Sequence, residues 1–305
     1  MPRVNFWAAG RTVRFTTWGV SGTLAVDNEN YATLAQETLW RWVAAGDRAV
    51  NRFLPTSELS VINAEPWATH QISDAFIEFF DAALESYDTS DGLCTPTVLD
   101  ALEAWGYDAD IDDVQRDGRS APLTASAAAP LASVAFDRAA RRLSPNGVRL
   151  DFGASAKAFV ADQVAREVGR HTPVLVELGG DVAVGGAVRP WSVGVAEDAE
   201  HIGAPIGITS GGVATSSTLV RNWSTGTGRA HHIIDPRTGA PVISPWRTVS
   251  VAADSCLTAN ALSTASLLWG EEALYYVTQA GWAARFVDHD GKVLCVGGWP
   301  QEVAS

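Results

Sequence analysis

Two histidines and an aspartate lie close together in the segment His-His-Ile-Ile-Asp-Pro-Arg-Thr-Gly at positions 231–239. A histidine titrates near neutral pH and needs a neighbour that fixes its tautomer, so His232 is a candidate general base and Asp235 the group that orients it. The alternative is a plain turn, because an Asp before Pro and Gly often closes an Asx-type turn with the histidines at the surface. The residues alone leave both interpretations open.

Two oxygen-bearing side chains further along the chain suit a divalent cation. Asn260 and Thr264 stand four residues apart in a segment with helical spacing, which places them on one face of a helix. Magnesium prefers oxygen ligands and usually completes its shell with water, backbone carbonyls and phosphate oxygens. The pair is therefore compatible with Mg²⁺ bound together with a phosphorylated ligand.

One of the only two lysines, Lys157, occurs where a strand gives way to a helix, after Leu-Asp-Phe-Gly-Ala-Ser-Ala at 150–156. The free N–H groups of a first helical turn, with Asp151 beside them, can hold polar ligand groups, and the lysine can neutralise a phosphate. A solvated lysine is the alternative. Glycine pairs at 179–180, 185–186 and 211–212 either bring backbone close to a ligand or form plain turns.

Hydrophobic periodicity predicts the elements that position these residues. Apolar residues recur at helical spacing, every three to four positions, in four segments, at 31–53, 76–87, 154–168 and 257–268. Short runs of β-type residues bounded by Gly and Pro predict strands at 174–178, 191–195, 248–253 and 283–287. Because helices and strands do not alternate regularly, we expect an α+β fold rather than a doubly wound parallel sheet.

Composition restricts the classes of partner. The chain has 305 residues, of which 47% are hydrophobic, enough for one large domain or two small ones. Its net charge of -13 argues against nucleic acid or an anionic membrane as a partner. The first twenty residues contain no apolar run typical of a signal sequence or a membrane span, so we expect a cytoplasmic protein. The Ala- and Pro-rich stretch 121–130 is expected to be a surface connection.

Read in order, six segments resemble the ApbE family of FAD:protein FMN transferases. The segments are 51–63, 91–97 with Trp105 and Gly106, 150–162, 178–181, 214–216 and 232–239. The resemblance implies a T-fold-related α+β domain over residues 1–305, with antiparallel sheets, flanking helices and an FAD cleft between an N-terminal helical part and a C-terminal α/β part. It also implies a Mg²⁺-dependent reaction in which a Ser or Thr hydroxyl of an acceptor protein takes FMN from FAD and AMP leaves.

The matching motifs give individual residues implied roles. Those implied in catalysis are His232, Asp235 and Lys157. The metal positions fall on the carbonyl of Ala154, Asn260 and Thr264. The FAD site is expected to be lined by Trp18, Phe53, Leu93, Cys94, Thr95, Asp151, Lys157 and Ile234. Of the tryptophans, Trp18 and Trp223 are candidates to stack on a flavin or adenine ring, with core packing as the alternative.

Five positions depart from the family pattern, and they keep three functions open. Asn260 replaces a metal-ligating Asp, so metal affinity is expected to fall, because a neutral oxygen replaces an anionic one. The other departures are Trp18 for Met, Thr95 for Asp, Ala158 for Gly and Ser217 for Gly. The chain is therefore expected to be an FMN transferase, an FAD pyrophosphatase that releases FMN and AMP, or a flavin-binding or repurposed relative without the transferase reaction.

Overall fold

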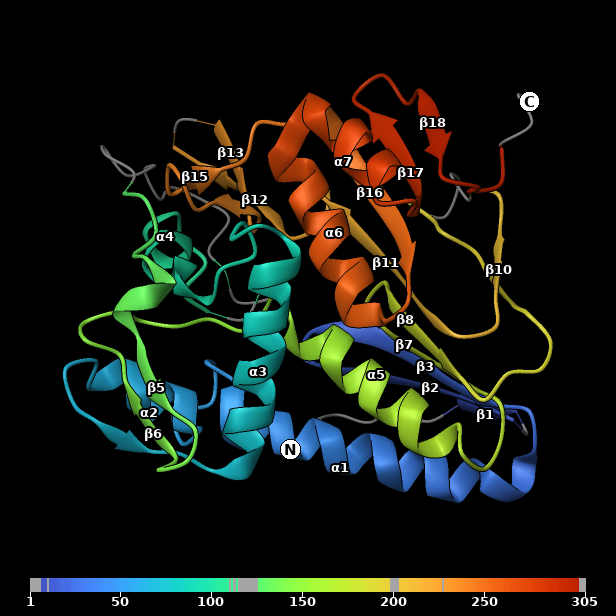
Figure 1. The fold of residues 1–305 in the computed structure, drawn as a ribbon, viewed down its shortest axis with the longest axis horizontal. Coiled ribbons are helices and arrows are strands. Elements are labelled where there is room, and N and C mark those ends of the chain that lie inside the picture. The colour runs from blue at the N-terminus through green and yellow to red at the C-terminus, as the bar shows by residue number, and fades with distance from the viewer. Residues whose placement is uncertain are drawn as a thin grey trace. The chain divides into compact units, whose positions relative to one another are not determined.

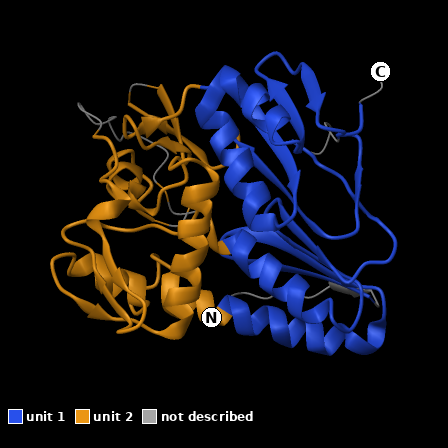
Figure 2. Ribbon diagram, viewed as in Figure 1, with its two compact units in different colours: residues 1–43, 157–217, 244–305 blue, residues 44–156, 218–243 orange. Residues whose placement is uncertain are grey.

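The computed structural model describes residues 7–9, 11–109, 111, 114, 126–197, 203–226 and 228–301 (Figure 1). The chain divides into two compact units, each built from separate stretches of sequence (Figure 2). Unit 1 comprises residues 1–43, 157–217 and 244–305, and unit 2 comprises residues 44–156 and 218–243. The chain thus leaves unit 1 twice and returns to it twice.

Nine strands of the described part of unit 1 form one sheet, in the order β1-β2-β3-β7-β8-β11-β16-β17-β18. Every neighbouring pair is antiparallel, which confirms the α+β prediction. A small hairpin, β9–β10, belongs to the same unit. The strands are β1 (Trp7–Ala9), β2 (Thr12–Thr17), β3 (Val20–Val26), β7 (Val174–Leu178), β8 (Asp181–Gly185), β9 (Trp191–Val193), β10 (Ile206–Ile208), β11 (Gly211–Ser217), β16 (Trp246–Ala253), β17 (Ala283–Asp288) and β18 (Val293–Val296).

Three of the four predicted strands lie inside these elements, and 174–178 coincides with β7. The predicted strand 191–195 is shorter in the structure, because its partner β10 provides only three residues for pairing. Residues alternate between faces along β8: Val182 and Val184 pack with β9 and β10. Asp181 and Ala183 therefore point to the opposite face.

Four helices that lie wholly or mainly in unit 1 accompany the sheet: α1 (Ala32–Val50), of which residues 44–50 belong to unit 2, α5 (Ala156–Val168), α6 (Cys256–Trp269) and α7 (Ala273–Gln279). In Figure 1, α1, α5 and α6 lie in front of the sheet. The predicted helix 31–53 ends early, at Val50, because the side chain of Asn51 accepts a hydrogen bond from the N–H of Phe53 at 3.0 Å and forms a turn. None of the described helices is long and apolar enough to cross a membrane.

A carboxylate of α5 holds the start of α6. The two oxygens of Asp162 accept hydrogen bonds from the N–H groups of Cys256 and Leu257, each at 2.8 Å. These N–H groups lack partners within the helix, and a negative charge at the helix N-terminus is favourable. Asp162 thereby ties together the helix that carries Lys157 and the helix that carries Asn260 and Thr264.

Unit 2 is built from short helices and hairpins around aromatic side chains. Its elements are α2 (Glu58–Ala64), α3 (Asp74–Thr89), α4 (Leu99–Ala104), β4 (His70–Gln71), β5 (Ala135–Asp137), β6 (Arg142–Ser144), β12 (Asn222–Thr225), β13 (Gly228–His231), β14 (Ile234–Asp235) and β15 (Ala240–Pro241). The predicted helix 76–87 lies within α3, whose Phe76 and Phe80 pack against Phe152 at 5.6 and 5.9 Å between ring centroids.

Two sequence expectations are resolved in unit 2. Trp223 is 2% exposed, stacks on Tyr107 and donates a hydrogen bond from its indole to the carbonyl of Trp105 at 2.8 Å. It is therefore a core residue and does not offer a face to a ligand. In the expected connection 121–130, residues 126–130 contain neither helix nor strand, and residues 121–125 lie outside the described residues.

Candidate active site

The predicted site residues fall into one group in each unit. In unit 1 they are Trp18, Lys157, Asn260 and Thr264. In unit 2 they are Phe53, Leu93, Cys94, Thr95, Asp151, Ala154, His232, Ile234 and Asp235. Each group has its own geometry.

A buried carboxylate organises the group in unit 1. Asp181, at the start of β8, is 1% exposed. It forms an ion pair with the ammonium group of Lys157 on α5 and accepts a hydrogen bond from the Nδ2 of Asn260 on α6 at 2.9 Å. Sequence reasoning gave Asp181 no role, although it ends the Leu-Gly-Gly-Asp segment at 178–181. The predicted contact of Lys157 with a phosphate stays a prediction.

Two side-chain oxygens on α6 are suitable ligands for a hard divalent cation. The Oδ1 of Asn260 is buried and has no hydrogen-bond partner among the described residues. One helical turn further, the hydroxyl of Thr264 lies 2.8 Å from the Oγ of Ser216 on β11. An amide oxygen and a hydroxyl four residues apart are ligands that Mg²⁺ accepts, provided that other oxygens complete the shell. In the described part of the chain, no three His, Cys, Asp or Glu side chains gather to form a metal site.

The third predicted metal ligand belongs to unit 2. Ala154 is exposed and lies in the turn at 153–155, immediately before α5. A backbone carbonyl in a turn is a suitable magnesium ligand in principle. Its role as a ligand stays a prediction.

Trp18 occupies an unusual backbone conformation in unit 1. It connects β2 to β3 together with Gly19, and the φ angles of the two residues are 51° and 66°. Positive φ at both central positions is characteristic of a type I′ hairpin turn, which favours Asn or Gly. A tryptophan there costs roughly 1 kcal/mol or more. The half-buried Trp18 is thus kept in a strained turn, at a position where the resemblance implies an FAD contact.

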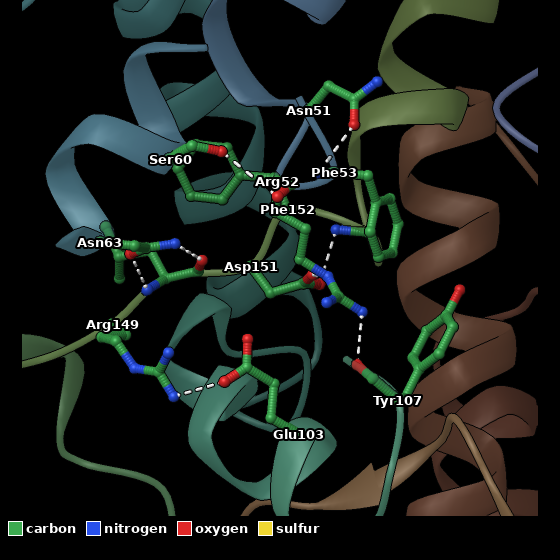
Figure 3. A network of polar contacts seen from close by, with 12 residues as sticks. Asn51, Arg52, Phe53, Ser60, Asn63, Glu103, Tyr107, Arg149, Asp151 and Phe152 are labelled. Carbon is green, nitrogen blue, oxygen red and sulfur yellow. Dashed lines mark hydrogen bonds and ion pairs between the residues drawn. The ribbon is translucent and has the colours of Figure 1, made fainter. Parts of the chain in front are cut away.

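A buried ion pair organises the group in unit 2. The Nε of Arg52 lies 2.7 Å from the Oδ2 of Asp151, and the two side chains are 7% and 10% exposed. Arg52 also donates to the carbonyl of Tyr107 at 3.0 Å (Figure 3). The Oδ1 of Asp151 accepts from the N–H of Gly153 at 2.8 Å. Sequence reasoning assigned Asp151 to a ligand and gave Arg52 no role, although Arg52 lies in the segment 51–63. In the structure, the carboxylate is already engaged by the guanidinium.

The same guanidinium supports an exposed aromatic ring. The Cζ of Arg52 lies 4.1 Å from the ring centroid of Phe53 and 4.7 Å from that of Tyr107. These cation–π contacts hold Phe53, which remains 37% exposed. A fixed, exposed ring suits stacking on a planar ligand, and the predicted contact of Phe53 with FAD stays a prediction.

Three further predicted FAD residues, Cys94, Thr95 and Ile234, make contacts within unit 2, and a fourth, Leu93, is half-buried. The N–H of Cys94 donates to Ser90, and Thr95 caps the short helical turn that follows, with its Oγ1 2.9 Å from the hydroxyl of Thr97. Ile234 is 5% exposed and packs with Trp223 in the core. Thr95 therefore acts as an N-cap in this structure.

The segment 231–239 contains the last residue of β13, all of β14 and the turn into β15. The carboxylate of Asp235 accepts three hydrogen bonds from Arg237, at 2.9, 2.9 and 2.8 Å, one of them from its backbone N–H. Burial raises the pKa of Asp235, but the hydrogen bonds and charge of Arg237 outweigh it and leave the pKa below its ordinary value. The Asx-type turn is thus formed. His232 is half-buried, and its orientation by Asp235 stays a prediction.

The histidine before His232 is fixed in one tautomer. The Nδ1 of His231 accepts a hydrogen bond from the N–H of Ile233 at 3.3 Å, so its Nε2 carries the proton and donates to the carbonyl of Val242 at 3.2 Å. Burial lowers the pKa of His231 below its ordinary value, although the hydrogen bond to Val242 acts in the opposite direction. His231 is therefore a neutral structural residue.

We expect Arg52→Met to lower the free energy of unfolding by about 3–5 kcal/mol, because it leaves the buried charge of Asp151 without its partner. Urea denaturation measures this loss. The matched control is Arg149→Met, since Arg149 forms a more exposed ion pair with Glu103 in the same unit and should matter by about 1 kcal/mol or less. Equal losses in the two variants would contradict the assignment.

We expect His231 to make stability depend on pH. Because its pKa is lower in the folded protein, the unfolded chain binds more protons between the two pKa values. The contribution is therefore complete above about pH 6.5 and is lost as the pH falls through the folded pKa. His231→Gln keeps one donor and one acceptor without a titratable ring. Its urea midpoint should therefore fall less than that of the wild type between pH 8 and pH 5, the range of about 5 to 8 in which histidines change charge. Parallel pH profiles would disprove this.

Comparison with known proteins identifies relatives that match most of this chain. The model of the ApbE family matches residues 11–286. An FAD:protein FMN transferase of Klebsiella pneumoniae (strain 342) is 24% identical over 294 residues, which are 91% of this chain and 83% of that protein. The solved ApbE protein of Thermotoga maritima has a TM-score of 0.80 and 25% identity and covers 95% of this chain and 97% of its own. The apo flavinyl transferase ApbE of Pseudomonas stutzeri, at 21% identity, has a TM-score of 0.74, with 93% of both chains covered, and supports the fold. The family match includes most of the sequence and both groups of site residues, and this chain belongs to the ApbE family.

Proposed function

We propose that this protein transfers FMN from FAD to a Ser or Thr hydroxyl of an acceptor protein, with Mg²⁺ bound, and releases AMP. One observation carries the proposal: α6 of an ApbE-family chain presents a buried amide oxygen of Asn260 without a partner among the described residues, one turn before the hydroxyl of Thr264. Named relatives such as the Klebsiella pneumoniae FAD:protein FMN transferase support the reaction class.

The reaction is a phosphoryl-type substitution. The acceptor oxygen forms a bond to the FMN-side phosphorus, the P–O bond of the pyrophosphate breaks, and AMP leaves with the bridging oxygen. A bound Mg²⁺ would neutralise negative charge on the pyrophosphate. Within unit 1, Asn260 and Thr264 would hold the cation. His232 would take the proton of the attacking hydroxyl.

The flavin end of FAD is assigned to unit 2. Phe53 offers an exposed ring that Arg52 holds from beneath, and this suits stacking on a planar heterocycle. The ammonium of Lys157 has one ion-pair partner in Asp181 and retains further donors for a phosphate oxygen.

We expect FAD binding, followed by flavin fluorescence, to strengthen with Mg²⁺ and to weaken with EDTA. With a soluble protein extract as acceptor source, flavin fluorescence should remain on an acceptor band in a denaturing gel, with AMP released. Thr264→Val should raise the Mg²⁺ concentration required by about tenfold or more, because it removes a ligand oxygen. The matched control is Thr258→Val on the same helix.

The outcomes separate the alternatives. AMP and an equal amount of free FMN without acceptor would assign an FAD pyrophosphatase instead. FAD binding that is indifferent to EDTA, without AMP, would assign a flavin-binding protein outside the transferase reaction. Equal effects of Thr264→Val and Thr258→Val would remove Thr264 from the cation site.

Asn260→Asp gives an independent test of the cation. The new carboxylate would face Asp181, at the position where the amide nitrogen now lies 2.9 Å from its oxygen. We expect a lower Tm without metal, because two like charges are buried together, and a larger rise in Tm with Mg²⁺ than in the wild type. Thermal unfolding with and without Mg²⁺ measures both, and a Tm rise no larger than in the wild type would contradict the assignment.

A further inference from the structure

The contact between Asp181 and Asn260 has only one chemically consistent orientation. The carboxylate of Asp181 can only accept hydrogen bonds while it is paired with the ammonium of Lys157. The atom of Asn260 that lies 2.9 Å from it must therefore be the donor, Nδ2. With the amide reversed, two oxygens would face each other at that distance, and the Nδ2 would occupy the place of the ligand atom.

A second hydrogen bond of Asn260 does not determine which way its side-chain amide is turned. The backbone carbonyl of Asn260 accepts a hydrogen bond from the hydroxyl of Ser263. This bond lies within α6 and does not involve the side-chain amide of Asn260. The Oδ1 itself has no partner among the residues that the structure describes. The hydrogen bond to Asp181 is thus the contact that distinguishes the two ends of the amide.

We propose that Asp181 is the positioning residue of the cation site: its carboxylate, with Lys157 as counter-charge, turns the side chain of Asn260 so that Oδ1 is left as the ligand oxygen. The inference rests on the proposed function, in which Asn260 binds the cation. An Asp at position 260 would offer an oxygen in either orientation. A neutral amide has one oxygen and one nitrogen, so at this chain's Asn260 the orientation decides whether a ligand is present at all.

The charge balance gives the proposal a distinct signature. The charges of Asp181 and Lys157 cancel each other, so this pair offers the cation no net charge. Removing only the carboxylate leaves the lysine unbalanced, and its repulsion alone would weaken cation binding. Removing both charges restores the balance but not the orientation of Asn260. The neutral double variant therefore separates positioning from electrostatics and from the stability lost with an unpaired buried charge.

The experiment is a titration of the purified full chain with Mn²⁺, followed by the EPR signal of free Mn²⁺, without FAD and with saturating FAD. The variants are Asp181→Leu, which has no acceptor for the Nδ2 of Asn260, and the double variant Asp181→Leu with Lys157→Met. The matched control is Glu177→Gln, which removes a carboxylate that caps Gly180 in the same hairpin and does not act on Asn260. Thermal unfolding establishes that each variant is folded.

We expect Mn²⁺ affinity to fall about 10- to 100-fold in both Asp181 variants and to stay within about twofold in Glu177→Gln, as is typical when the partner of a metal ligand is lost. Wild-type affinity in the double variant would overturn the positioning role and leave the cation site of the proposed function intact. No Mn²⁺ binding by the wild type in either condition would overturn the cation of the proposed function and this inference with it.

Discussion

A carboxylate that is 1% exposed must find partners within the fold, because an isolated buried charge costs several kcal/mol. Asp181 finds them on two different helices, Lys157 of α5 and Asn260 of α6. The two helices must therefore dock on the sheet in one relative position, and the carboxylate of Asp162 at the start of α6 reinforces it. The placement of the donors on α6 follows from this requirement.

Unit 2 also contains a buried ion pair, formed by different residues. Arg52 and Asp151 are both at most 10% exposed, and their ion pair joins the end of α1 to the turn before α5. A buried ion pair adds little net stability compared with apolar packing, but it tolerates few alternative arrangements. Arg52 therefore sets the position of Phe53, and Asp151 is committed to the fold. In each unit, a buried ion pair thus holds some of the candidate site residues: Lys157 and Asn260 in unit 1, and Phe53 and Asp151 in unit 2.

Four of the residues that depart from the expected family pattern, Thr95, Ser217, Ala158 and Asn260, make specific contacts or are buried in the structure. Thr95 caps a helical turn, Ser217 bonds to Thr248 and the carbonyl of Arg247, and Ala158 is 1% exposed within α5. Asn260 donates a hydrogen bond to Asp181, and its Oδ1 has no partner among the described residues. The neutral amide thereby avoids the repulsion that a second carboxylate would bring. The backbone of Trp18 is held at positive φ, in a turn that favours Asn or Gly.

Local pattern was enough to predict the α+β class, α3, α5 and α6, and β7 with its bounds, because hydrophobic spacing directly reflects which face of an element is buried. The sequence also determined that Asn260 and Thr264 share a helix face. The contacts that position candidate site residues join residues far apart in the chain: Asp181 with Asn260 in unit 1, and Arg52 with Asp151 in unit 2. No local spacing encodes such pairs. The tertiary structure decided them, because which partner a buried charge receives depends on how distant helices and strands pack together.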